Sequence, residues 1–312
     1  MSLRDLRQRD LRLIARFSSR YTVRGGTGLV FAILVLICGL MIAHTIITPV
    51  EQFKASMKSE RGIEMEDEEA VRELLRMARP AVEWAIGSGE HADEETSREA
   101  KTKAEEWASF LLDDRPALLS AVVLILLYVM PFLVAIGAFN QFSGDIQTRG
   151  LRYQLLRTDR ANIFFGRFLG ISIFNVGVTA LLVGAIVLYL GFKVKFYPWG
   201  DVITWGLRGF FALVVVSIPY IALCSWISSS FDAPFGSLVM CKLIVGVIPL
   251  LALLGRNTWE PLQYIQYVIP WGIQKFLLHP DTFTLLASVG ACLGYSVAFL
   301  SIGYFLFSRR DL

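Results

Sequence analysis

Three kinds of residue on which protein chemistry often depends are scarce in this chain of 312 residues. It has four cysteines and three histidines, and charged residues make up only 18% of it. The cysteines form no CxxC pair and no disulfide framework, and the histidines fit no H-E-x-x-H or other ligand spacing. No Ser/His/Asp set is recognisable either. The sequence therefore predicts no metal ion, cofactor or catalytic site within this chain.

A phosphate-binding loop is also missing. The motif G-x-x-x-x-G-K-[ST], whose backbone N–H groups cradle nucleotide phosphates, does not occur. The basic residues lie close to apolar segments, which is unlike a nucleic-acid-binding face. We therefore expect neither ATP hydrolysis by this chain alone nor nucleic-acid binding.

Hydrophobic residues are abundant, at 54% of the chain, against about 45–50% in a typical soluble domain. A helix of about 20 apolar residues spans a bilayer. Six stretches approach or exceed that length: Leu29–Ile47, Ala117–Phe139, Phe168–Leu190, Gly209–Ser228, Phe235–Leu254 and Phe283–Phe307. The sequence predicts an all-α polytopic membrane protein with six transmembrane helices.

Charge is distributed unevenly between the two sides of the predicted membrane protein. Segment 51–115 holds 10 basic and 18 acidic residues, whereas the rest of the chain has a basic excess. Arginines concentrate in residues 1–27, in the loop 141–167 and in the C-terminal tail. By the positive-inside rule these three regions share the cytoplasmic side, so both termini are expected there and segment 51–115 outside.

The predicted domain organisation follows from these patterns. Residues 1–27 form an amphipathic helix on the anionic cytoplasmic leaflet, with Leu6, Leu13, Phe17 and Tyr21 as its apolar line. The first transmembrane helix occupies 28–50, and residues 116–312 hold the other five.

The acidic segment 51–115 is predicted to be a helical extracytoplasmic insertion. Helices are expected over Glu66–Met77 and Glu94–Leu112, with Pro80 breaking or restarting the first and Gly87–Gly89 separating the halves. A second outer feature, residues 257–280, is apolar but interrupted by prolines. It predicts a broken helix of two short pieces dipping into the outer leaflet.

The loop after the second span is the most informative stretch. Asp145 and Arg149 stand four residues apart, acid first, which favours a helix by a few tenths of a kcal/mol. Leu151 and Leu155 fall on one side of that helix, and Arg160 lies where the chain re-enters the membrane. A stiff, charged helix over 142–157 could transmit a push from a soluble partner.

This loop resembles the segment between the second and third spans of type-2 ABC export permeases. The family pattern of an acidic residue, a glycine, a leucine pair, an arginine and a glycine–basic pair matches Asp145, Gly150, Leu155, Leu156, Arg160 and Gly166-Arg167. The tail Phe307–Asp311 is similar to the family's aromatic–Arg–Asp ending. Asp145 stands where glutamate is commoner, Arg167 where lysine is, and the family's Pro-x-Ser is absent.

The resemblance implies a permease subunit in the inner membrane of a prokaryote. Two permeases, identical or homologous, would form the translocation path, and separate ATP-binding subunits would hold ATP and magnesium. The residues implied to contact those subunits are Asp145, Arg149, Gly150, Leu151, Arg152, Leu155, Leu156 and Arg160.

Two alternatives remain beside ATP-driven export. The same complex could transmit force or a signal to an envelope partner through segment 51–115, or the chain could be a nucleotide-independent channel or intramembrane enzyme. Asn175 and Lys242, polar residues within predicted spans, are candidates for the path or for helix packing, and Arg208 is most simply an interface anchor. The sequence does not specify the substrate.

Overall fold

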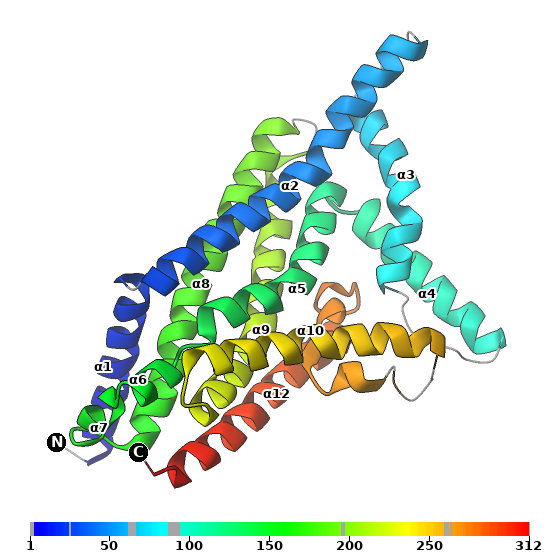
Figure 1. Ribbon diagram of the computed structural model, residues 1–312. Coiled ribbons are helices and arrows are strands. Elements are labelled where there is room, and N and C mark those ends of the chain that lie inside the picture. The colour runs from blue at the N-terminus through cyan, green and yellow to red at the C-terminus, as the bar shows by residue number, and fades with distance from the viewer. Residues whose placement is uncertain are drawn as a thin grey trace.

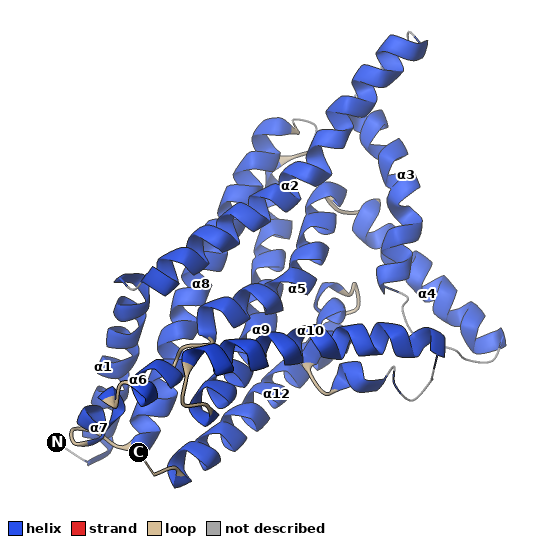
Figure 2. Ribbon diagram, viewed as in Figure 1, coloured by secondary structure: helices blue, strands red, loops and turns tan. Residues whose placement is uncertain are grey.

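The computed structural model describes residues 3–24, 26–61, 67–86, 94–194, 197–258, 262 and 264–311. Throughout these ranges the regular structure is helical and no strand occurs (Figure 2). The all-α class predicted from the sequence is therefore confirmed.

Six helices in the described ranges are long and apolar enough to cross a membrane. They are α2 (Gly26–Arg61), α5 (Ala117–Ala138), α8 (Arg160–Lys193), α9 (Trp199–Ser230), α10 (Pro234–Thr258) and α12 (Thr282–Arg309). These helices correspond in order to the six predicted spans, so a multi-pass membrane protein is confirmed.

Helices α5 and α9 form the centre of the bundle. Two thirds of the residues in their most apolar segments are buried inside the chain, against 28% for α2 and α10 and 22% for α12. Helix α9 packs on α5, α8, α10 and α12 (Figure 1). The outer helices therefore keep most of their apolar surface free to face lipid.

Helix α1 (Leu3–Arg24) packs against the start of α8. Two glycines of α8, Gly166 and Gly170, allow α1 to approach closely. A Cβ on Gly170 would lie 2.7 Å from the Ala15 carbonyl oxygen, and one on Gly166 would lie 2.7 Å from the Ile14 side chain. Leu13 and Phe17, from the predicted apolar line, are exposed. The side of α1 that packs on α8 is therefore different from the apolar side predicted from the sequence.

The segment between α2 and α5 contains two helices, α3 (Asp67–Ile86) and α4 (Glu94–Leu112). The prediction that Pro80 breaks or restarts the first of them was wrong, because α3 continues through it. Pro80 is exposed, so the hydrogen bond that its ring removes is lost at the surface rather than in the interior. Residues 87–89, the predicted separator, lie outside the described ranges.

In the described residues 264–278, the stretch before α12 is built from 3₁₀ turns. Its described turns are Tyr264–Tyr267, Pro270–Gly272 and Gln274–Leu278. Pro270 begins one turn and has no N–H to continue a helix from the preceding residues, and Ile273 then bonds to it with the i to i+3 spacing. The predicted broken segment is seen here, as three short 3₁₀ turns rather than two pieces.

Helix α4 and these turns are joined by one side chain. The Trp107 indole N–H donates to the Leu278 carbonyl at 3.4 Å, and the ring stacks on Phe276 and lies edge-on to His279.

Asp281 caps the start of α12. It accepts from the Thr284 hydroxyl and amide and from the Phe283 amide, and these donors lower the pKa of Asp281.

Candidate functional site

The loop between α5 and α8 is an elbow of two short helices, α6 (Ser143–Gln147) and α7 (Gly150–Leu155). The prediction of a single helix over 142–157 was therefore wrong. The break falls at Arg149, whose φ of 58° places it in the left-handed region. That conformation is uncommon for a residue with a Cβ and ends α6 before Gly150 starts α7.

Arg167 of α8 braces the elbow. Its guanidinium is ion-paired with Asp145 of α6, donates to the Gln141 carbonyl, donates to the Gln154 side chain of α7 at 2.8 Å, and lies over the Phe142 ring. The arginine is 8% exposed. Asp145 thus pairs across to α8, whereas the predicted helical support from Arg149 is lost because the helix breaks there.

The start of α6 is held from α9. The Ser228 hydroxyl accepts the backbone N–H groups of Phe142 and Ser143 at 2.9 and 3.1 Å. One turn earlier, Ser225 donates to the Gln141 side chain at 2.7 Å. The Ser228 hydroxyl thus satisfies backbone donors that a helix N-terminus otherwise leaves unpaired.

An aromatic cluster fills the space beneath the elbow. Phe142, Phe164 and Phe307 come from the ends of three different segments and lie with ring centroids 5.3 to 5.7 Å apart. Leu151 of α7 is buried among them, and Leu155 packs against the same cluster. The elbow, the start of α8 and the end of α12 are therefore packed as one unit.

Arg160 ties α8 to the C-terminal tail. One of its terminal nitrogens donates to the carbonyls of Phe307, Ser308 and Arg310 at 3.2, 2.8 and 2.7 Å. The first two belong to the last turn of α12, where carbonyls lack helical partners. Among the residues implied to face a partner, Arg160 is thus engaged within the chain.

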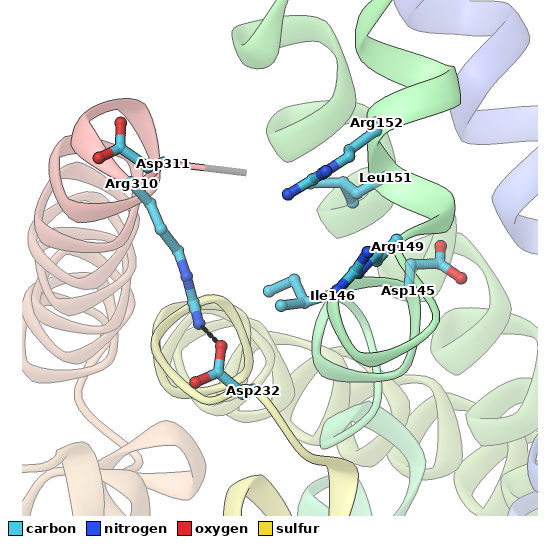
Figure 3. Close-up of a pocket in the computed structure, with 8 residues that line it drawn as sticks. All are labelled: Asp145, Ile146, Arg149, Leu151, Arg152, Asp232, Arg310 and Asp311. Atoms are coloured by element: carbon cyan, nitrogen blue, oxygen red, sulfur yellow. Dashed lines mark hydrogen bonds and ion pairs between the residues drawn. The ribbon is translucent and has the colours of Figure 1, made fainter.

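Arg310 extends this network to the turn between α9 and α10. It is ion-paired with Asp232 and donates to the Ser229 carbonyl. A pocket of about 180 Å³ lies between this tail and the elbow (Figure 3). It is lined by Asp145, Ile146, Arg149, Leu151, Arg152, Asp232, Arg310 and Asp311. Sequence reasoning gave Asp232 no role, since nothing in its local sequence connects it with the tail.

The elbow leaves two large apolar side chains in the open. Leu156 is 84% exposed and Tyr153 is 74% exposed. The sequence singled out Leu155 and Leu156 as a pair, yet the structure separates them, because Leu155 packs inward. Tyr153 was missed, although its spacing from Leu156 is that of neighbours on one helical face.

The polar candidates within the spans differ in their surroundings. Lys242 of α10 donates to the Phe132 carbonyl of α5 at 2.6 Å and lies over the Phe132 ring. It therefore joins two helices. Asn175 of α8 is buried and its side-chain oxygen accepts no hydrogen bond in the described part of the chain, so the expected bond to a neighbouring helix is not seen at that atom.

An apolar groove of about 750 Å³ runs along α2. Nine of its ten lining residues belong to α2, and Ile125 of α5 is the tenth. Across the described ranges no group of three or more His, Cys, Asp or Glu residues could hold a metal ion, and the four cysteines are free.

In comparisons with known proteins, no family model matches the chain and no curated protein matches it.

Proposed function

We propose that the chain is the membrane-spanning permease subunit of an ATP-driven ABC exporter. The observation that carries the proposal is the elbow. It presents Tyr153 and Leu156 on a surface braced from behind by Arg167 and by the aromatic cluster. An exposed apolar pair on a rigid mount is suited to insertion into a groove of a soluble subunit.

In this proposal the partner subunits hold ATP and magnesium and perform the hydrolysis. Their closure would push on α7 through Leu156, with Arg149 and Arg152 supplying exposed positive charge beside it. The push would reach α8 and α12 together, because Arg160 and the aromatic cluster join them. Such a coupled movement of packed helices is the ordinary form of a transport transition.

A second permease copy, or a related permease, would cover the groove on α2. The groove is apolar and belongs to one of the least buried spans. The elbow end, where both termini also lie (Figure 1), would face the cytoplasm of a prokaryotic cell, and α3 and α4 would lie outside.

Co-purification tests the proposal. The full chain is expressed in its native host with an affinity tag, and the eluate is examined for a co-eluting ATP-binding protein and for ATPase activity. We expect both with the unchanged chain and a loss of at least fivefold with Leu156→Asp. The matched control, Met77→Asp, changes an exposed residue of α3 and should retain both. Repeated purification without any ATPase would contradict the proposal.

Force transmission without transport is the second candidate. It is favoured by α2, which continues without interruption from the membrane to Arg61 and packs on α3. Reconstituted vesicles containing the complex separate the two: ATPase activity with no flux of any tested solute or lipid would favour transmission.

A further inference from the structure

At the end of the bundle that carries α3 and α4, two arginines share one aromatic base. Phe110 of α4 and Trp205 of α9 meet edge to face with centroids 5.8 Å apart. The guanidinium carbon of Arg115 lies 5.1 and 5.5 Å from the two ring centroids, and that of Arg208 lies 5.7 and 5.0 Å from them. Two positive charges from separate segments are thus gathered over the same two rings.

No carboxylate among the described residues forms an ion pair with either arginine. Asp113 and Asp114 adjoin Arg115 in the chain, yet both are exposed and make no ion pair with it. Aromatic faces attract a cation but carry no net charge. Because like charges repel at this range, an anion from outside the chain would stabilise the arrangement.

The cluster also has more donors than acceptors. Arg208 donates from one terminal nitrogen to the His279 carbonyl at 2.6 Å, while its buried Nε–H and the buried indole N–H of Trp205 have no acceptor in the described part of the chain. Arg115 is exposed, and its contacts are the two rings. The guanidinium N–H groups that make no bond within the described residues could therefore bind an oxygen-rich ligand.

The positions of Arg115 and Arg208 in the bundle indicate the surroundings in which they would meet a ligand. Arg115 lies in the turn just before the apolar helix α5, and Arg208 lies in the first part of α9. Trp199 and Trp205 also lie in the first part of α9, and Trp107 lies in α4, which packs on this end of α5. Tryptophans gather at the depth of lipid headgroups, where phosphate groups are concentrated.

We propose that Arg115 and Arg208 form a binding site for a phosphate group. Each guanidinium is a planar fork that matches two phosphate oxygens, and two forks from different segments would hold one phosphate from two sides. The phosphate comes either from a phospholipid headgroup or from a free phosphate-bearing solute. The site stands independently of the proposed ATPase partner, because none of its residues belongs to the elbow.

Native mass spectrometry of the purified full chain in an uncharged detergent tests this site. The chain is titrated separately with phosphatidylglycerol, with diacylglycerol of the same acyl chains and with inorganic phosphate. Arg115→Gln and Arg208→Gln are compared with Arg76→Gln, which removes an exposed arginine of α3 that has Glu73 beside it. Arg208→Lys, which keeps the charge but not the fork, covers the case in which Arg208→Gln does not fold.

We expect phosphatidylglycerol to bind and diacylglycerol not to bind, with a tenfold or greater loss of affinity in Arg115→Gln and in whichever Arg208 variant folds. Arg76→Gln should bind as the unchanged chain does. A loss of affinity for inorganic phosphate alone supports the site and identifies the free solute as its ligand. Equal affinity in Arg115→Gln and Arg76→Gln for both phosphate probes would overturn the proposal.

Discussion

The guanidinium of Arg167 on α8 and the carboxylate of Asp145 on α6 form an ion pair that holds the elbow against the bundle. The arginine side chain is 10% exposed and the aspartate side chain 37% exposed. Removal of the carboxylate leaves a nearly buried positive charge with neutral partners only. This pair is therefore one of the contacts that hold the elbow, together with Ser228 and the aromatic cluster.

Asp145→Asn should lower stability by about 1–3 kcal/mol, the usual cost of depriving a buried charged group of its partner. Thermal unfolding of the purified chain in detergent measures the effect. Asp201→Asn, an exposed aspartate in the first turn of α9, serves as control and should change the midpoint little. Equal midpoints for the two variants would show that the ion pair contributes nothing.

Gly170→Ala should separate α1 from α8, because the new methyl group would meet the Ala15 carbonyl oxygen at 2.7 Å. A cost of about 1–3 kcal/mol is expected for such overpacking. Gly177→Ala on the same helix meets nothing within 4 Å and should be neutral or stabilising by up to about 1 kcal/mol. Thermal unfolding compares the two, and a destabilised Gly177→Ala would contradict the packing described.

Leu155→Asp should affect stability, whereas Leu156→Asp should affect the binding of the ATPase partner. Leu155 packs on the aromatic cluster, so its replacement by aspartate should lower the unfolding midpoint by several degrees. Leu156 is exposed, so its replacement should leave the midpoint unchanged while reducing ATPase co-purification. If both variants lost stability equally, Leu156 would not be a surface residue.

His279 should make stability depend on pH. Burial has the largest effect on His279 and lowers its pKa below 6.5. The nearby Asp281 raises this pKa by a smaller amount, and repulsion from Arg208 lowers it further. Neutral His279 also accepts the Asp281 backbone N–H at its Nδ1. The folded state thus binds the proton less readily than the unfolded state. Its contribution is fully present above about pH 6.5 and is lost as the pH falls toward the lower folded pKa.

Thermal midpoints at pH 7.5, 6.5 and 5.5, compared with those of His279→Gln, check this expectation. The unchanged chain should lose more stability between pH 6.5 and 5.5 than the variant does. Parallel curves for the two proteins would mean that His279 does not titrate in that interval.

The orientation of the chain can be read from the labelling of single added cysteines. Thr102→Cys on the exposed surface of α4 should react with a membrane-impermeant thiol reagent in intact cells, whereas Arg157→Cys after α7 should react only after lysis. The native cysteines provide the background, and three of the four are buried. The reverse pattern would invert the proposed topology.

The sequence predicted the spans well because a helix in a bilayer needs only length and apolar composition, and both are local properties. The elbow could not be read in the same way. Asp145 pairs with Arg167, 22 residues away, rather than with Arg149, and Arg149 itself has a left-handed backbone conformation. Neither feature can be read from the local pattern. The sequence also did not predict that α3 continues through Pro80. That continuity depends on which side of the helix the proline occupies, and Pro80 lies on the exposed side.

The exposed surface of the elbow could be predicted only in part, for a similar reason. Leu155 and Leu156 look equivalent in sequence, and packing against Phe142 and Phe307 decides which of them is exposed. The pairing of Arg310 with Asp232 joins residues 78 positions apart. No pattern in a single sequence indicates such a contact.

The length of α2 gives the chain a lever. With 36 residues it measures about 54 Å, nearly twice the apolar thickness of a bilayer. A rigid tilt of about 5° around one end would displace the other by about 5 Å. Because α3 packs on α2, a small tilt of α2 would move α3 by a larger distance.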